Sequence, residues 1–159
     1  MVGILHLVNQ MPFDWTARKT TTVESATYGS ELTAARICVD QIVEIRNLLR
    51  YLGVPLRERS YMFGENEAVV NSSIKPFAKL HKRHNLLSFH RVREAIASGM
   101  IVFRHLSGKF NPSDTLSKHW SHKDVWTTLR PLLFWPGDTF ELVDIEDRLQ
   151  DECNAQSRN

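Results

Sequence analysis

Residues 60–70 constrain the fold most strongly, because a strand-like run there passes directly into a helix-like one. The first four residues, Ser-Tyr-Met-Phe, form a short, aromatic and apolar run that predicts a buried strand. Gly64 ends the run, and Ala-Val-Val at 68–70 can begin a helix for which Asn66 is a suitable N-cap. Glu65 follows at the carboxyl end of the strand, where α/β proteins usually place chemistry, although a polar strand end needs no chemical role.

The remaining elements alternate in type around this stretch. Residues 3–9 and 13–19 predict an antiparallel hairpin, whose second strand has one apolar and one polar face. Residues 72–77 form a polar loop that contains a proline. Further elements are predicted as a strand at 100–106 and helices at 27–52, 80–98, 112–119 and 123–134. This order predicts the mixed α/β class, with a small sheet flanked by helices.

The helix predicted at 27–52 is amphipathic. Glycine and proline at 53 and 55 end it. Because Glu31 lies one turn before Ala35 on the apolar stripe, a carboxylate is expected on the buried face. An acid near a helix N-terminus also interacts favourably with the helix dipole, which is the alternative explanation for Glu31. The stripe itself, at the three-and-four spacing of a buried helix face, comprises Ala35, Cys38, Ile42, Ile45, Leu49 and Leu52.

Length and composition are those of a single globular domain. With 159 residues, 42% of them hydrophobic and 24% charged, the chain can bury a core of its own. No apolar run approaches the roughly 18 residues of a membrane span, and Cys38 and Cys153 are too far apart to suggest a disulfide framework. We therefore expect an intracellular protein with a domain at 1–139, followed by an acidic tail at 140–159 that is frayed or disordered.

Charge is distributed unevenly along the chain. Residues 1–137 have a net charge of +7, and residues 138–159 have a net charge of −5. Within the basic part, the acid-free segment 68–93 indicates a surface for a polyanion, although a basic run can equally be a solvated helix face. Between residues 68 and 93 the chain has no acid, three histidines and six basic residues, which are Lys75, Lys79, Lys82, Arg83, Arg91 and Arg93.

Three carboxylates stand at the ends of predicted elements: Glu31 at the start of the long helix, Glu65 after a strand, and Asp114 after the last strand. Carboxylates that come together repel one another unless a cation lies between them. Oxygen ligands favour Mg²⁺ or Mn²⁺ over zinc. Two such ions about 4 Å apart can hold the attacking water and the leaving oxygen of a phosphodiester. Asp114 also fits a first-turn acid that is stabilised by the helix dipole alone.

Several short stretches carry a family resemblance when they are taken in order. They are TVESATYGSE at 22–31, LLRYLGVP at 48–55, GEN at 64–66, KRH at 82–84, HRVREA at 90–95 and NPSDTLSK at 111–118. Together they resemble the ribonuclease H domain of copia-type retrotransposon polyproteins. Each stretch alone is a weak signal, but the ordered set is a strong one, and the resemblance runs from about residue 3 to residue 139.

The resemblance implies a ribonuclease-H-like fold and metal-dependent hydrolysis of the RNA strand of RNA–DNA hybrids. It implies that Glu31, Glu65 and Asp114 are catalytic residues and ligands of Mg²⁺ or Mn²⁺. It also implies a partner, the upstream reverse-transcriptase segment of the polyprotein, and a location in cytoplasmic virus-like particles or in the nucleus. The implied contacts to the nucleic-acid backbone are Lys82, Arg83, Arg91 and Arg93.

Two departures from the family pattern predict weak or absent nuclease activity. The family's first catalytic Asp lies on a strand before the hairpin, and this sequence begins at the hairpin, so we expect a truncated domain that lacks the first strand. The family usually has Asp where Glu65 stands, and one extra methylene moves the carboxylate by roughly 1 Å or more, which a metal site tolerates poorly. The alternative is a non-catalytic nucleic-acid-binding relic, or a pseudogene product, with the same fold.

Overall fold

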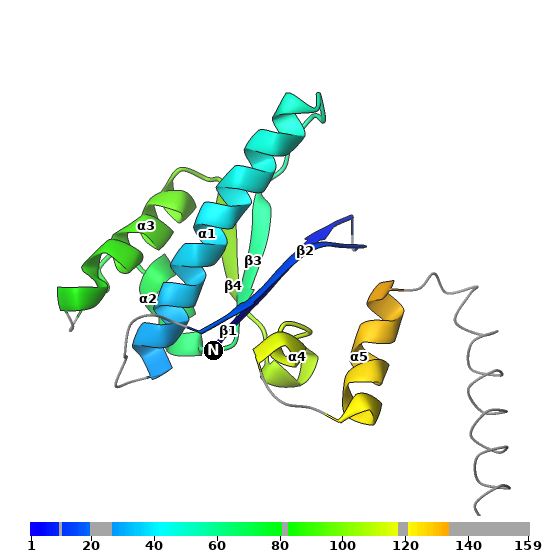
Figure 1. The fold of residues 1–159 in the computed structure, drawn as a ribbon. Coiled ribbons are helices and arrows are strands. Elements are labelled where there is room, and N and C mark those ends of the chain that lie inside the picture. The colour runs from blue at the N-terminus through cyan, green and yellow to red at the C-terminus, as the bar shows by residue number, and fades with distance from the viewer. Residues whose placement is uncertain (10, 20–26, 81–82, 118–120, 134–159) are drawn as a thin grey trace, which may run out of the picture. The chain divides into compact units, whose positions relative to one another are not determined.

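The computed structural model describes residues 1–9, 11–19, 27–80, 83–117 and 121–133 (Figure 1). The chain divides into two compact units. The larger unit consists of residues 1–4 and 16–117, and the smaller unit consists of residues 5–15 and 118–159. The tail predicted at 140–159 lies outside the described residues.

The chain belongs to the mixed α/β class, as predicted, with two small sheets and several helices. Two short 3₁₀ turns occur at Arg83–Asn85 and Gly108–Phe110. The strands are β1 (Val2–Val8), β2 (Met11–Arg18), β3 (Ser60–Gly64) and β4 (Ile101–His105). The helices are α1 (Thr27–Tyr51), α2 (Glu67–Ile74), α3 (Leu86–Ala97), α4 (Asp114–Ser117) and α5 (His122–Leu133).

The strands form two separate pairs. β1 pairs with β2, which confirms the predicted hairpin. Only two residues connect these strands, whereas a parallel pair needs a crossover of a dozen or more, so the pair is antiparallel. β3 pairs with β4 in parallel, in a register that runs from Ser60 opposite Ile101 to Gly64 opposite His105. The carboxyl ends of β3 and β4 therefore lie side by side.

Helix α1 supplies much of the core of the larger unit. Leu32 and Val39 on this helix are completely buried, and Ala35 and Ile42 are buried beside them. The predicted stripe was right at Ala35 and Ile42 but wrong at Leu52, which lies beyond the last helical residue and is 65% exposed. The reason is length, because the last turns of α1 extend past the elements that α1 packs against (Figure 1).

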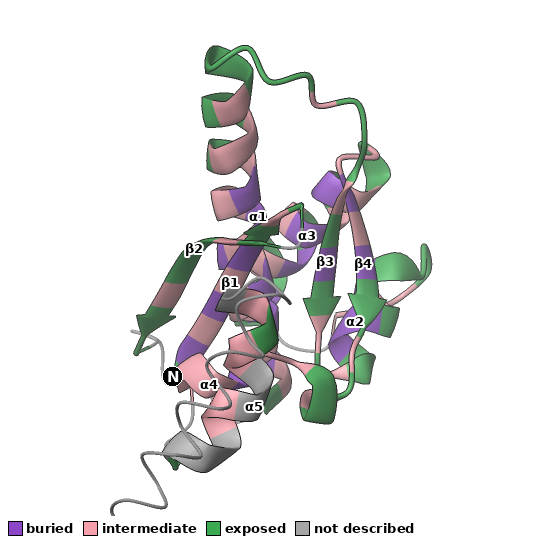
Figure 2. Ribbon diagram, turned by 90° about the vertical axis from the view of Figure 1, so that its right-hand side faces the viewer, coloured by how far each residue is buried: buried purple, intermediate pink, exposed green. Residues whose placement is uncertain are grey.

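The β3–β4 sheet is covered on one face only. Met62, Ile101 and Phe103 are buried on the face that packs against the helices. On the other face Tyr61 is 60% exposed and Phe63 is 54% exposed, so the expectation of a buried strand was wrong for that face. Figure 2 shows exposed bands along both β3 and β4.

Local hydrogen bonds determine where the elements near β3 begin and end. Asn66 caps α2 as predicted, because its side-chain oxygen accepts from the backbone N–H groups of Ala68 (3.0 Å) and Val69 (3.3 Å). The loop predicted at 72–77 starts too early, because α2 continues to Ile74. The Ser73 hydroxyl donates to Val69 O at 2.8 Å, which keeps this polar residue within the helix. Likewise, α3 begins at Leu86 rather than at residue 80.

The smaller unit contains helix α5, which begins one residue before the predicted position. Pro131 lies inside this helix, in its last turn. In the part of the chain that the structure describes, none of the helices combines the length and apolar character needed to span a bilayer.

Candidate functional site

Glu65 is exposed and directly follows β3. Its carboxylate lies against Gly108, where an added Cβ would come within 2.8 Å of the Glu65 side-chain carboxyl carbon. Its backbone oxygen is 3.0 Å from His105 Nε2. Since a carbonyl oxygen can only accept, Nε2 carries the proton and donates it. The lack of a side chain at Gly108 leaves room for the Glu65 carboxylate, and the hydrogen bond from His105 holds the Glu65 backbone at the carboxyl edge of the sheet.

Asp114 is a buried carboxylate at the first residue of α4. The preceding turn is held by Asn111, whose side-chain oxygen accepts from the backbone N–H (3.2 Å) and the hydroxyl (2.8 Å) of Ser113. Strand β1 passes close to this turn, because a Cβ added at Gly3 would come within 2.7 Å of Ser113 O. The first residues of β1 therefore pack against the turn that precedes Asp114.

Glu31 lies in the first turns of α1 and is half-buried, next to the fully buried Leu32. The start of α1 is tied to α2 by a hydrogen bond of 2.8 Å between the hydroxyls of Tyr28 and Ser72. The expectation of a carboxylate in line with the core therefore holds in part, since Leu32 rather than Glu31 occupies the centre of the buried face.

The three predicted carboxylates have the oxygen chemistry that Mg²⁺ and Mn²⁺ prefer. Among the described residues, however, no three His, Cys, Asp or Glu side chains gather into a group that could hold a metal ion. Glu31, Glu65 and Asp114 are therefore not brought together as a ligand set.

Arg93, one of the predicted backbone contacts, binds the protein's own main chain. Its guanidinium donates to the carbonyl oxygens of Ser72 (3.1 Å), Lys75 (2.6 Å) and Pro76 (2.7 Å). It also lies over the Phe89 ring, with 5.1 Å from Cζ to the ring centroid. Arg93 thus satisfies carbonyls at the end of α2 and in the segment that follows, and it joins α3 to α2.

Arg91 is engaged by acids. Its Nε donates to Asp40 on α1 at 3.0 Å, and its Nη1 donates to Glu94 at 3.3 Å. The hydrogen bond to Asp40 is the main reason that the pKa of Arg91 is raised above its ordinary value, and the bond to Glu94 adds to it. These two carboxylates offset much of the charge that Arg91 could offer to a phosphate.

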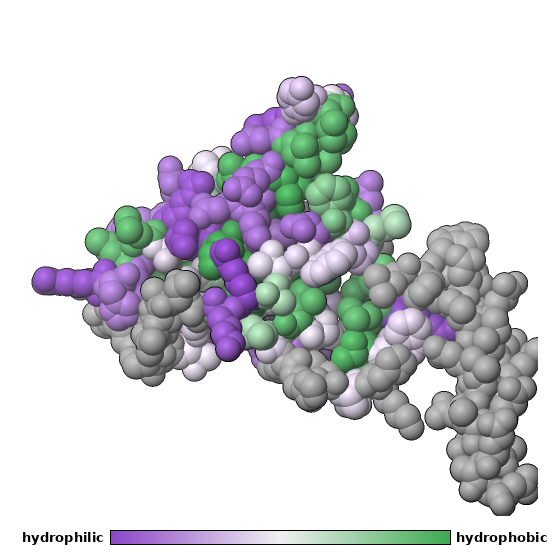
Figure 3. Space-filling model, in the orientation of Figure 1, coloured by the Kyte–Doolittle hydropathy of each residue, from purple (hydrophilic) through white to green (hydrophobic). Residues whose placement is uncertain are grey.

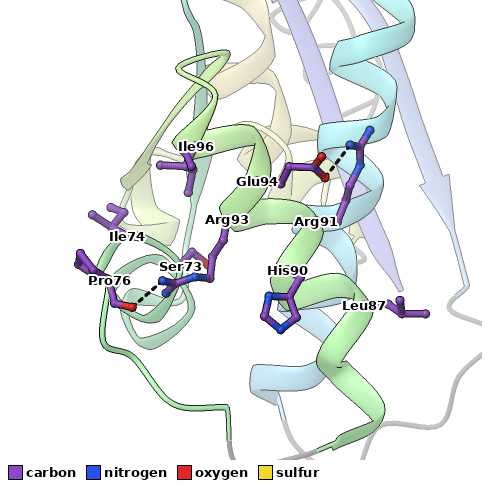
Figure 4. Close-up of a pocket in the computed structure, with 10 residues that line it drawn as sticks. Ser73, Ile74, Pro76, Leu87, His90, Arg91, Arg93, Glu94 and Ile96 are labelled. Carbon is purple, nitrogen blue, oxygen red and sulfur yellow. Dashed lines mark hydrogen bonds and ion pairs between the residues drawn. The ribbon is translucent and has the colours of Figure 1, made fainter.

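A groove of about 740 Å³ lies between α3 and the end of α2 (Figure 4). Figure 4 shows Arg93 directed towards Pro76 on one side and Arg91 directed towards Glu94 on the other. Two of the three basic and imidazole side chains that line the groove are thus already bound within the protein. The lining comprises Ser73, Ile74, Pro76, Leu87, His90, Arg91, Arg93, Glu94, Ile96 and Ala97.

Five other cations of the larger unit are exposed and form no ion pair with any described residue. Lys75, Lys79 and Arg83 belong to the acid-free segment. Arg104 on β4 and Lys109 in the 3₁₀ turn beside Glu65 are likewise exposed and form no ion pair with a described residue. The sequence pattern did not indicate them, because each is the one basic residue in its stretch. Lys82 lies outside the described residues. In Figure 3 hydrophilic side chains predominate over much of the larger unit, and an apolar patch marks the far end of α1.

No protein-family model matches the sequence, and neither a curated protein nor a solved structure matches the chain.

Proposed function

We propose that this chain is a ribonuclease-H-like module of copia-type retrotransposon origin that binds RNA–DNA hybrids and hydrolyses their RNA strand weakly or not at all. The observation that carries the proposal is a contrast between basic and acidic side chains: the chain has exposed basic residues but no gathered set of the predicted carboxylates. Lys75, Lys79 and Arg83 are exposed and unpaired among the described residues, which suits phosphate binding. The three carboxylates that a nuclease would need are not gathered.

The order of the elements supports the fold assignment. A hairpin, a long helix, and two parallel strands separated by helices follow one another as the resemblance implies. Glu65 directly follows β3, and the segment that leads to Asp114 follows β4. Because the two strands are parallel, both segments begin at the same edge of the sheet. This edge is where α/β proteins bind their substrates.

The proposed hybrid contacts are electrostatic. Lys75 and Lys79 are on the segment after α2, and Arg83 is in the 3₁₀ turn before α3. Such contacts bind phosphates without regard to sequence and weaken steeply with salt. An A-form-like hybrid would additionally be recognised through the 2′-hydroxyls of its RNA strand. A reverse-transcriptase segment of the same polyprotein would supply the hybrid, in a virus-like particle or in the nucleus.

Salt-dependent binding of a labelled RNA–DNA hybrid tests this proposal. Changing Lys75, Lys79 and Arg83 together to Gln should weaken binding, and the slope of log K against log salt should fall by about 0.9 for each lost phosphate contact. A matched variant with Gln at Lys19, Arg50 and Arg57, which are exposed elsewhere in the larger unit, controls for net charge. Equal weakening by both variants would contradict a specific surface.

Hydrolysis is tested separately, with Mn²⁺ and a hybrid labelled on its RNA strand. We expect little or no cleavage, because the carboxylates are not gathered and Glu65 stands where the family has Asp. Clear cleavage that is lost in Asp114→Asn would instead establish the second candidate function, an active ribonuclease H.

A further inference from the structure

The uncovered face of the β3–β4 sheet is a surface that the proposed hybrid contacts do not use. Tyr61 and Phe63 lie on it with more than half of their surface exposed. In the parallel register Arg104 is directly opposite Phe63, and it is exposed as well. Because residues in register project to the same side of a sheet, the two rings and the guanidinium share one face.

We propose that this face binds single-stranded nucleic acid, with the rings of Tyr61 and Phe63 stacking on successive bases and Arg104 contacting the backbone. The proposal stands apart from the hybrid binding proposed above. Exposed aromatic side chains on a sheet, next to a basic group, are a recurrent way to bind unpaired bases.

The spacing of the two rings favours an unpaired strand over a duplex. Residues two apart on a strand have Cα atoms about 7 Å apart. Successive nucleotides of a stacked duplex strand are only about 3.4 Å apart. A single strand whose bases are splayed can match the wider spacing, whereas a duplex cannot without losing its stacking.

Charge on the two strands points to the same ligand. β3 (SYMFG) and β4 (IVFRH) contain no acid, and Arg104 is their one permanent charge. Its Cα is about 5 Å from that of Phe63 across the sheet, within reach of the phosphate that joins two stacked nucleotides. A guanidinium in this position attracts an anionic backbone and can also stack on a base.

The size of the surface argues against a protein partner. A stable protein–protein interface buries about 800 Å² on each side and involves some 20–30 residues. The exposed face of two five-residue strands presents far fewer side chains than that. It matches the footprint of two nucleotides better than that of a folded partner.

The test is binding of fluorescent 12-nucleotide single strands to the full chain, with the RNA–DNA hybrid measured in parallel. Tyr61→Ala and Phe63→Ala should each weaken single-strand binding roughly tenfold, and the double variant should leave hybrid binding unchanged. Phe63→Trp should retain affinity, whereas Phe63→Leu should lose it. The control pair is Tyr51→Ala with Phe77→Ala, two aromatic residues that are 89% and 94% exposed outside this face.

Two further measurements make the outcome decisive. Arg104→Gln should lower the salt slope for single strands by about 0.7, and Arg104→Lys should restore it. Photocrosslinking with 5-bromouridine should label the tryptic peptide that begins at Ser60. The proposal is overturned if the chain fails to bind single strands, if the double variant binds them like the unmodified chain, or if crosslinks map elsewhere. It is equally overturned if sedimentation shows self-association that the double variant abolishes, because the face would then contact a second copy.

Discussion

The two faces of the β3–β4 sheet carry similar side chains and meet different surroundings. On one face Met62, Ile101 and Phe103 are almost completely removed from water. On the other face Tyr61 and Phe63, from the same five-residue strand, stay more than half exposed. Residue type therefore predicts that this segment is a strand, but it does not predict which side of the strand is covered.

The difference comes from the helices. α1, α2 and α3 all pack against the covered side of the strands. Parallel sheets in α/β proteins usually have helices on both faces, so the open face is an exception. An exposed pair of aromatic residues on such a face contributes little to folding.

The largest expected contrast is between two phenylalanines on opposite faces. Phe103→Ala should lower the free energy of unfolding by about 3–5 kcal/mol, because it leaves a cavity in the core. Phe63→Ala should change it by less than about 0.5 kcal/mol, because this ring is already exposed. Urea unfolding measures both values. Comparable losses would show that the open face is covered in solution.

Two glycines near the edge of the sheet give a smaller contrast. Gly64→Ala should cost about 1–3 kcal/mol, because the new Cβ would come within 2.9 Å of the buried Phe103 ring. Gly108→Ala meets the end of the exposed Glu65 side chain instead, which can move away at little cost. Thermal and urea unfolding of the two variants check this difference, and a larger loss at Gly108 would contradict it.

The cap of α2, one of the helices on the covered face, gives a third measurement. Asn66→Ala removes the two N-cap hydrogen bonds and should cost about 1 kcal/mol. Asn71→Ala is the matched control, because Asn71 is exposed and makes a single long side-chain bond of 3.4 Å to Glu67. Equal effects of the two changes in urea unfolding would mean that the cap does not hold this helix in place.

The smallest effect on stability at neutral pH is expected at Cys38 on α1, which packs both against the main core around Leu32 and Val39 and against the small cluster of Val2, Ile4 and Ile37. Burial raises the pKa of its thiol to about 12. The unfolded thiol loses its proton from about pH 9, whereas the folded thiol keeps it, so this contribution to stability falls as pH rises from about 9 towards 12. The free energy of unfolding should fall more between pH 7 and pH 10 in the variant Cys153→Ser than in the same variant with the further change Cys38→Ala. Identical pH profiles would show that the thiol is accessible.

Part of the candidate site could be predicted because it depends on neighbouring residues. Asn66 was predicted as a cap, and the structure confirms it through bonds to backbone groups two and three residues away. Glu65 at the end of β3 and Asp114 at the start of α4 were placed at their element ends for the same reason. The pairing of Arg91 with Asp40, 51 residues away, could not be predicted, because no local pattern indicates it.

The sequence by itself determined the mixed α/β class, the hairpin, the extent of α1 and the passage from β3 into α2. These features rest on periodicity and on hydrogen bonds that span three or four residues. Only the tertiary structure decided which face of β3 is covered, which arginines are bound within the protein, and that the three carboxylates are not gathered. Those outcomes depend on how α1, α2 and α3 pack on a single face of two strands, and long-range packing of this kind has no signature in any one stretch of residues.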